Sequence, residues 1–473
     1  MRWLLLFTAF LGFHPLIAEE KNAQKKNAEQ KYNVVLIYTD DMGYGDLGCY
    51  GHPSHRTPHL DRLAWEGVRF TQFYVAQAVC SASRAALLTG CYPNRIGILG
   101  ALDHTSQKGI SREETTLAGM LKSIGYRTAC FGKWHLGHHA PFLPTNHGFD
   151  EYAGIPYSND MWPRHPNAKA GYPELPWIVG DKTVELDPDQ NQFTTRLTRL
   201  ATDFISRHAK QPFFLYLAHP MPHVPLHVAR ERRGQSAEGL YGDVIEEIDW
   251  STGEILAELK KQGLDEKTLV IFASDNGPWL SYGNHAGSAG GLREGKGTTF
   301  EGGIRVPCLA RLPGIIPAGL RCDQPAMTID ILPTLANLLS APMPTLPIDG
   351  KDIWPLFTKP AAPSPHEVLY FYWNQELQAV RSGPWKLHFP HNFRALKLPA
   401  GKDGRPSSYG TGTIELSLFD LENDPAEQHN RVEQEPAVVQ ALMKKAELAR
   451  RELGDSLTKR EGTATRPPGN FSR

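Results

Sequence analysis

The sequence lacks an excess of charge of either sign. Its 473 residues carry 50 lysines and arginines against 51 aspartates and glutamates, for a net charge of -1. A protein that neutralises many phosphates usually has a basic excess, so this balance argues against nucleic-acid binding. No polybasic patch supports binding to a membrane surface either. The length is sufficient for one large α/β domain and a smaller one.

Long apolar runs are missing beyond the N-terminus. Trp3 to Ile17 is almost wholly apolar, follows the basic Arg2 and ends at the small Ala18. This pattern predicts a secretory signal peptide over residues 1–18, because the run is short for a membrane span and a His-Pro pair interrupts it. We therefore expect an exported protein without a membrane anchor, which would be periplasmic or secreted, or lysosomal in a eukaryote. The polar residues 19–32 predict a flexible leader.

Cysteine is scarce for a protein that a disulfide scaffold would stabilise. Cys308 and Cys322 are the closest pair in sequence after Cys80 and Cys91, and the sequence leaves any pairing open. The six cysteines are Cys49, Cys80, Cys91, Cys130, Cys308 and Cys322.

The chain does have apolar runs of strand length that alternate with segments of helical period from Asn33 onward. This order predicts an α/β fold over 33–345, with a large, mostly parallel sheet flanked by helices. Two proline-rich stretches follow Ala341, and then come short alternating runs and a helix from Pro436 to Leu453. They predict a smaller C-terminal α+β subdomain over 366–457, with an antiparallel sheet and one helix. We expect the tail, 458–473, to be disordered.

Polar side chains gather directly after four predicted strands and at one helix start. Open α/β sheets place their ligand sites at the carboxyl ends of their strands. Five such clusters therefore predict one site. The strands are Val34–Tyr38, Arg127–Phe131, Phe213–Ala218 and Leu269–Ala273, and the helix begins at Cys80.

Two of these clusters offer only hard oxygen ligands. Asp40 and Asp41 follow the first strand, and Asp275 and Asn276 follow the last. Either pair alone is typical of a turn or a helix cap. Together, three carboxylates and an amide suit calcium or magnesium better than zinc.

Cys80 would stand at a helix N-terminus, where free backbone N–H groups favour anions. Arg84, one turn later, would lie on the same face and reinforce this preference. The alternative for Cys80 is a buried structural cysteine. Lys133 and His135 form another cluster and would point to one side if that segment is extended; the alternative is a solvated loop.

Histidines recur every fourth residue at His219, His223 and His227, as on a zinc-binding helix. The intervening prolines forbid that helix, so an extended loop that presents one histidine is the better interpretation. Lys296 lies in GGLREGKG, which nearly matches a phosphate-binding P-loop. Glycine replaces the final Ser/Thr and no strand precedes it, so a nucleotide site is disfavoured. Lys296 remains a candidate contact to an anion or a leaving group.

At this point the motifs resemble those of one family, the formylglycine-dependent sulfatases of the alkaline phosphatase superfamily. The resemblance spans about Asn33 to Asn430, and its blocks look most like those of the arylsulfatase A and N-acetylgalactosamine-6-sulfatase members. The blocks occur in the family's order: TDDMGYGDLGCYG, CSASR with LLTG, GKWHLG, PHVP, SDNG and GKGTTFEGGIRVP.

The resemblance implies that Cys80 is oxidised to formylglycine, whose hydrated aldehyde attacks sulfur and later expels sulfate. It also implies a calcium ion held by Asp40, Asp41, Asp275, Asn276 and the modified Cys80. The other roles it implies are polar contacts to the reacting groups. Arg84 would favour the nucleophilic oxyanion, Lys133 would hold sulfate, His135 would act as a base, and His223 and Lys296 would assist the departing alcohol. His219 competes with His223 for that last role.

Two residues depart from the family signature. Ala82 replaces the commoner proline and Cys91 an arginine. Both lie where a formylglycine-generating maturation enzyme, an expected partner, would bind, so the sequence leaves open which enzyme acts.

The expected substrate is a sulfated carbohydrate or an aryl sulfate, with a sulfated sugar first. Loop residues that could face a glycan are His104, Tyr157, Trp162 and His285. The alternatives are a phosphoester or phosphonate hydrolase on the same scaffold, and a non-catalytic glycan-binding relative.

Overall fold

The computed structural model describes residues 31–165, 171–359 and 361–471. The predicted signal peptide, most of the predicted leader and the last two residues lie outside these ranges. Within them, no helix combines the length and apolar character that crossing a membrane requires.

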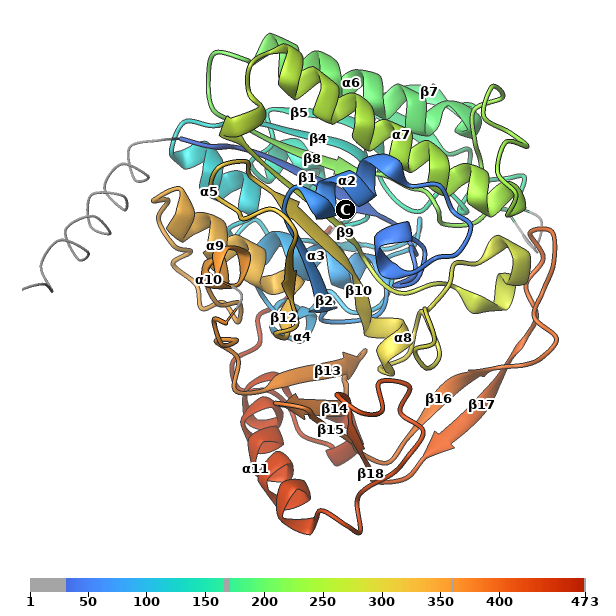
Figure 1. Cartoon of the computed structure of the whole chain (residues 1–473), viewed down its shortest axis with the longest axis vertical. Helices are drawn as coiled ribbons and strands as arrows, with labels where there is room; N and C mark the ends of the chain where they lie inside the picture. Colours follow the sequence, from blue (N-terminus) through green and yellow to red (C-terminus); the bar gives the residue numbers. More distant parts are fainter. Residues whose placement is uncertain (1–30, 166–170, 360, 472–473) are drawn as a thin grey trace, which may run out of the picture.

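A large mixed sheet forms the centre of the protein (Figure 1). Within the described ranges it has eleven strands, and its middle strands β9, β1, β8, β4 and β5 run parallel. The antiparallel strand β10 joins β9 to β2, and β6 and β7 extend the opposite edge. The strands are β1 (Asn33–Thr39), β2 (Val68–Tyr74), β4 (Arg127–Lys133), β5 (Glu151–Ile155), β6 (Pro176–Val179), β7 (Lys182–Leu186), β8 (Phe213–Ala218), β9 (Thr268–Ser274), β10 (Arg305–Arg311), β11 (Leu320–Cys322) and β12 (Ala326–Met327). The four predicted strands and the mostly parallel α/β sheet are confirmed.

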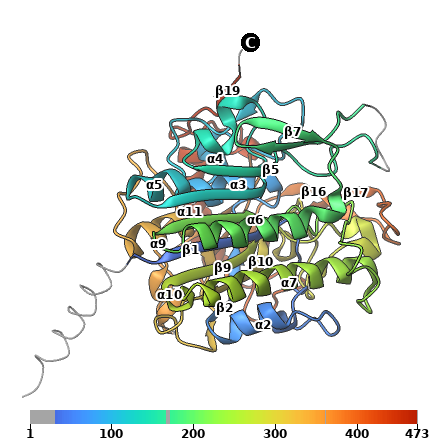
Figure 2. The same cartoon turned by 90° about the horizontal axis from the view of Figure 1, so that it is seen from above.

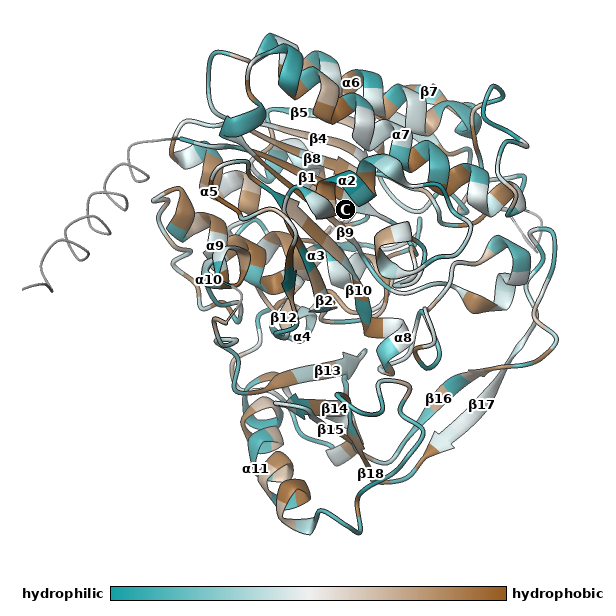
Figure 3. Ribbon diagram, in the orientation of Figure 1, coloured by the Kyte–Doolittle hydropathy of each residue, from teal (hydrophilic) through white to brown (hydrophobic). Residues whose placement is uncertain are grey.

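Helices cover both faces of this sheet because β1 is apolar on both sides. Val34 and Leu36 belong to one hydrophobic cluster, with the helices α3 (Cys80–Thr89), α5 (Leu117–Ser123), α9 (Ile331–Leu338) and α10 (Trp354–Thr358). The alternate residues Val35 and Ile37 belong to a second cluster, with α2 (Pro58–Trp65), α6 (Phe193–Arg207) and α7 (Gly239–Lys261). Figure 2 shows α6 and α7 side by side across the sheet, and Figure 3 shows the apolar residues concentrated in the central strands.

A smaller antiparallel sheet follows in the chain, as predicted. Its order is β13 (Leu369–Trp373), β14 (Glu376–Ser382), β15 (Trp385–His388) and β18 (Ser417–Asp420), and α11 (Pro436–Leu453) packs on it. Its apolar side is continuous with the main core, since Tyr74 and Phe371 have ring centroids 5.4 Å apart. A hairpin that the sequence patterns did not reveal, β16 (His391–Leu396) and β17 (Tyr409–Ile414), projects from this sheet (Figure 1).

The prediction of a disordered tail from Thr458 is wrong for the residues described. The strand β19 (Gly469–Asn470) pairs with β3 (Lys108–Gly109). Before it, Arg466 donates two hydrogen bonds, of 2.7 and 2.8 Å, to the buried carboxylate of Glu114. A charged pair of this kind and strand pairing fix the tail to the main domain, although its sequence has no apolar periodicity.

Candidate active site

The predicted clusters meet at one edge of the sheet. Because β9, β1, β8 and β4 are adjacent and parallel, the residues after their carboxyl ends are neighbours. Asp40 and Asp41 follow β1, Asp275 and Asn276 follow β9, Lys133 ends β4, and the loop after β8 carries His223. The side chains of all six are buried.

The carboxylates and the amide form one compact group. Asp41 has a positive φ of 65°, and its N–H donates to Asp275 Oδ1 at 3.1 Å. The Asn276 side-chain amide donates to Asp41 Oδ1 at 2.7 Å. Among the described residues, Asp41 Oδ2 and Asn276 Oδ1 are buried oxygens without a hydrogen-bond partner. Oxygens without partners among acidic side chains are ligands of the kind that a hard cation prefers.

Cys80 is the first residue of α3, as predicted. Val79 before it is extended, and Gly90 closes the helix in the left-handed conformation with a φ of 71°. The Cys80 Sγ lies 3.2 Å from Asp40 Oδ1 and 3.4 Å from Lys296 Nζ. Ligand atoms of Asp40, Asp41, Cys80 and His223 lie within 4.8 Å of one another. Burial, reinforced by the charge of Asp40, raises the pKa of the Cys80 thiol, so the thiol is protonated at neutral pH.

Arg84 is fully buried and already paired. Its guanidinium lies 2.9 Å from Asp275 Oδ2 and 3.4 Å from Asp40 Oδ2, and donates to the Lys133 carbonyl at 3.1 Å. The sequence led us to expect that it reinforces anion binding at the helix start. In the structure it first holds two carboxylates in place, and its charge still lies at the site.

Two lysines contribute further positive charge. The ammonium of Lys133 donates to Asp40 Oδ2 and, at 3.1 Å, to Ser158 Oγ. Lys296 Nζ lies 2.6 Å from Asp41 Oδ1 and 4.5 Å from the centre of the Trp279 ring. Burial acts to lower the pKa of Lys296, but the surrounding negative charges, that of Asp41 first, together outweigh burial and raise it. Both ammonium groups therefore stay charged beside Cys80.

The acidic groups titrate unequally because they share a confined space. Burial, with the charge of Asp40, raises the pKa of Asp275 to about 7. Burial also opposes ionisation of Asp40, yet Lys133, His223 and Arg84 together hold its pKa well below the usual range. Three carboxylates (Asp40, Asp41 and Asp275) and three cations (Arg84, Lys133 and Lys296) leave a formal charge of zero. A divalent cation would give the site a net +2, which suits a bound anion.

His135 has one ring nitrogen without a partner. Its Nε2 lies 2.7 Å from the Leu102 carbonyl, which can only accept, so Nε2 carries the proton. Among the described residues, Nδ1 is buried without a partner. Burial and the charge of Lys133 lower the pKa of His135 well below its usual range. The segment is not extended here, since His135 has a φ of 60°, so strand alternation does not extend from Lys133 to His135.

His223 lies at the site and His219 faces elsewhere. His223 Nε2 is 3.6 Å from Asp41 Oδ2, and its Nδ1 donates to the Val224 carbonyl at 2.6 Å. His219 instead lies 3.3 Å from Ser251 Oγ on α7. Burial alone lowers the pKa of His219 to about 3, so it is a neutral core residue.

Sequence reasoning missed Ser158, Trp279 and Arg394. Ser158 follows β5, which we had not identified, although β5 neighbours β4. Trp279 comes shortly after the Asp275-Asn276 pair, and its ring lies 5.5 Å from that of His223. Arg394 lies on the hairpin strand β16.

The loop residues considered for a glycan contact different neighbours. His104 and Tyr157 have ring centroids 6.5 Å apart, whereas Trp162 lies against His227. His285 lies beside the 401–405 turn of the C-terminal hairpin. Of the four, only His104 and Tyr157 are in ring contact with each other.

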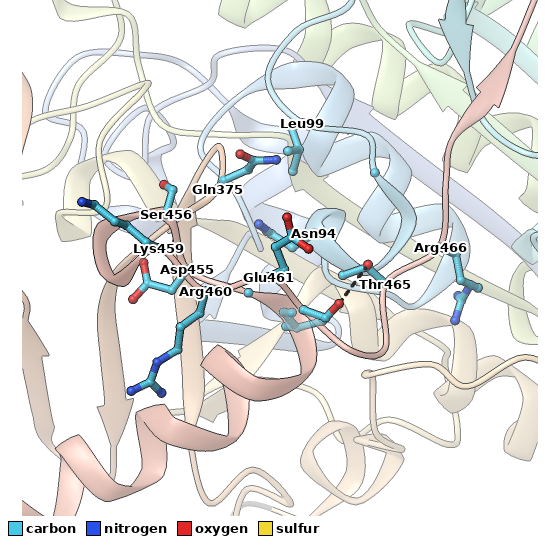
Figure 4. A pocket seen from close by; sticks show the side chains of 14 residues that line it. Asn94, Leu99, Gln375, Asp455, Ser456, Lys459, Arg460, Glu461, Thr465 and Arg466 are labelled. Carbon is cyan, nitrogen blue, oxygen red and sulfur yellow. Dashed lines mark hydrogen bonds between the residues drawn. The ribbon is translucent and has the colours of Figure 1, made fainter.

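A cavity of about 610 Å³ lies apart from this site, where the tail meets α4 (Pro93–Ile96) and the end of α11 (Figure 4). Its lining mixes charges of both signs, with Asp455, Lys459, Arg460 and Glu461. Neither Cys80 nor any residue of the carboxylate group lines it, so we do not assign the reaction to this cavity.

Comparison with known proteins agrees with this geometry. The model of the Sulfatase family matches residues 32–341, and the model of the C-terminal region of aryl-sulfatase matches 364–467. The chain is 39% identical to arylsulfatase A of Bos taurus, over 90% of this chain and 89% of that protein. It is 40% identical to N-acetylgalactosamine-6-sulfatase of Canis lupus familiaris, over 76% and 72%. The crystal structure of the PsFucS1 sulfatase from Pseudoalteromonas sp. superposes with a TM-score of 0.81 at 28% identity and covers 92% and 93% of the two chains.

Proposed function

The chain belongs to the sulfatase family, whose members are sulfuric ester hydrolases within the alkaline phosphatase superfamily, and we propose that it cleaves sulfate esters of sugars with a formylglycine made from Cys80. The observation that carries the proposal is the position of Cys80. Its Sγ lies at the start of a buried helix, between the carboxylate of Asp40 and the ammonium of Lys296. Residues 33–345 would form the catalytic domain.

The residues after β1 and β9 fit a calcium ion. Asp40, Asp41, Asp275, Asn276 and the modified Cys80 would hold it, and the two orphaned oxygens support this assignment. Bound calcium would supply positive charge that favours ionisation of the nucleophile. The hydrated aldehyde of formylglycine would supply an oxygen nucleophile where the thiol, protonated at neutral pH, is a poor one.

The chain's own residues would bind sulfate and move protons. Lys133, which contacts the Asp40 carboxylate beside Cys80, would hold sulfate oxygens, and Lys296, which contacts Cys80 Sγ, would assist the departing oxygen. Arg84 would keep Asp40 and Asp275 in place while adding positive charge. The unpartnered Nδ1 of His135 is a suitable base for a hydroxyl proton. To protonate the departing alcohol, His223 would have to be an imidazolium, with one proton at Nδ1 bound to the Val224 carbonyl and a second at Nε2 on the side of Asp41.

Turnover of matched nitrophenyl esters tests the reaction class. Sulfate and phosphate esters share a geometry, so a phosphoester hydrolase could use the same scaffold. We expect kcat/KM on nitrophenyl sulfate to exceed that on nitrophenyl phosphate by at least about 100-fold. The opposite preference would contradict the proposal, and no turnover of either ester, or of sulfated sugars, would favour a binding protein.

Substitution of the two histidines in the loop after β8 should have different effects on turnover. A sugar alkoxide is a poor leaving group and needs a proton, whereas nitrophenolate leaves unaided. We expect His223→Ala to lower kcat/KM on a sugar sulfate by about 100- to 1000-fold and on nitrophenyl sulfate by less than about tenfold. His219→Ala is the matched control, since His219 contacts Ser251 and should show no such contrast.

Equal losses on both substrates in His223→Ala would mean that His223 positions sulfate instead. A contrast seen only in His219→Ala would assign the proton to the other histidine.

The family likeness also supports a sulfated carbohydrate as substrate, because one similar protein is named for a sulfated amino sugar. We further propose export, and a maturation enzyme that oxidises Cys80 as a transient partner. The N-terminal segment and the CSASR motif support these proposals.

A further inference from the structure

The hairpin of β16 and β17, which projects from the C-terminal subdomain (Figure 1), carries an arginine that reaches the edge of the site. Arg394 on β16 donates a hydrogen bond from Nη2 to the backbone carbonyl of Lys296. The side chain of Lys296 in turn contacts Cys80 and Asp41. Arg394 therefore contacts a residue that itself contacts the reacting centre, although Arg394 comes from a different subdomain.

Aromatic rings and a glycine hold the Arg394 guanidinium in place. It lies 4.7 Å from the centre of the Tyr409 ring on β17 and 5.9 Å from that of Trp279. Gly297, which follows Lys296 with a φ of 81°, leaves the space that the guanidinium fills, since a Cβ there would overlap it. The arginine is thus packed into a defined position rather than extended into solvent.

Arg394 has no direct ion-pair partner in the described part of the chain, and Asp41 and Glu294 act on its charge only from a greater distance. In the ranges that the structure describes, no carboxylate lies within 4.0 Å of its nitrogens, unlike those of Arg84. Among the residues that the structure describes, neither Arg394 Nε nor the buried indole Nε1 of Trp279 has a hydrogen-bond partner. Arg394 and Trp279, which pack near each other, therefore each contribute an N–H donor without an acceptor. Arginine stays charged in proteins and binds planar or tetrahedral oxyanions well.

The pair formed by Arg394 and Trp279 lies on the leaving-group side of the site. Trp279 contacts His223 and Lys296, the two residues proposed to assist the departing alcohol. A group that contacts Arg394 would therefore belong to the sugar, not to the sulfate that is cleaved.

We propose that Arg394 and Trp279 form a subsite for a second oxyanion of the substrate, a carboxylate or another sulfate on the same sugar or its neighbour. This proposal rests on the proposed function and deepens it. The enzyme would act on acidic or multiply sulfated saccharides, with the second charge setting its specificity. Arg394 would be a binding residue, contributed by the C-terminal hairpin, that recognises sugar beyond the reacting sulfate.

The test compares the wild type with Arg394→Ala on each of four substrates. They are nitrophenyl sulfate, a neutral monosulfated sugar, the same sugar with a second sulfate, and a monosulfated disaccharide with a uronate. We expect the wild type to prefer one of the last two. Arg394→Ala should raise KM for that substrate roughly 10- to 100-fold, as for a lost charge-assisted hydrogen bond, and at least tenfold more than for nitrophenyl sulfate. Which of the two responds identifies the second oxyanion.

Lys397→Ala removes the same charge from the exposed end of the hairpin and should leave the preference unchanged. A readout without turnover uses Cys80→Ala as background. There, calorimetric binding of the preferred saccharide should weaken by a similar factor with Arg394→Ala and not with Lys397→Ala.

Two outcomes would overturn the subsite. Equal losses on all four substrates would mean that Arg394 only positions Lys296. A wild type that shows no preference for a second anion would mean that the proposed subsite binds no oxyanion. A wild type inactive on all four sulfate esters would instead contradict the proposed function.

Discussion

Cys80→Ala is expected to lower sulfate ester turnover by at least about 10⁴-fold, as deletion of a covalent nucleophile does in other hydrolases. The variant should still fold, because the change removes one sulfur atom at the start of α3 and leaves the helix and its Gly90 cap intact. Steady-state kinetics on nitrophenyl sulfate, with circular dichroism as the check on folding, measure both properties.

Cys308→Ala is the matched control. Cys308 is also fully buried, but it lies within β10 and its backbone hydrogen-bonds to the Tyr50 hydroxyl, not to the carboxylate group. We expect this variant to lose packing and some stability while turnover stays close to wild type. Wild-type turnover by Cys80→Ala would remove Cys80 from the reaction.

Asp275→Ala is expected to lower kcat/KM by about 1000-fold, which corresponds to about 4 kcal/mol of transition-state stabilisation. Asp275 is buried, pairs with Arg84 and accepts the N–H of Asp41, so its loss removes a metal ligand and disturbs two neighbours. In wild type, calcium at about 100 times its Kd should stabilise the fold by about 2.7 kcal/mol. In the variant, melting should no longer respond to added calcium.

Asp249→Ala separates a metal role from the general cost of losing a buried carboxylate. Asp249 accepts backbone N–H groups of His59 and Leu60 at 3.0 and 2.8 Å, at the start of α2. This variant should be less stable but keep its response to calcium. If Asp275→Ala keeps wild-type activity and the calcium response, Asp275 is not a ligand.

The position of the site could be predicted because it depends on local patterns. The buried strand before Asp40 and the one before Asp275 are continuous apolar runs, and parallel strands bring their carboxyl ends to one edge. Gly90 after an alanine-rich segment marked the end of α3. These signals need only a few residues and no knowledge of distant contacts.

What could not be predicted depends on tertiary contacts. The tail of the chain is fixed by the pairing of Arg466 with Glu114 and of β19 with β3, and neither leaves a periodic pattern. Arg394 reaches the site only because the β16–β17 hairpin extends from the C-terminal subdomain to the catalytic one. The strands of this hairpin are half exposed and weakly apolar, so the sequence gives little sign of them. The orientation of His135 follows from a left-handed backbone that strand alternation does not anticipate.

The proposed reaction depends on a formylglycine at position 80. Mass spectrometry of the peptide that contains this position, from active protein made in a host with a maturation enzyme, tests it directly. We expect an aldehyde in place of the thiol, in a fraction of molecules that rises with specific activity. Fully active protein in which position 80 is only cysteine would contradict it.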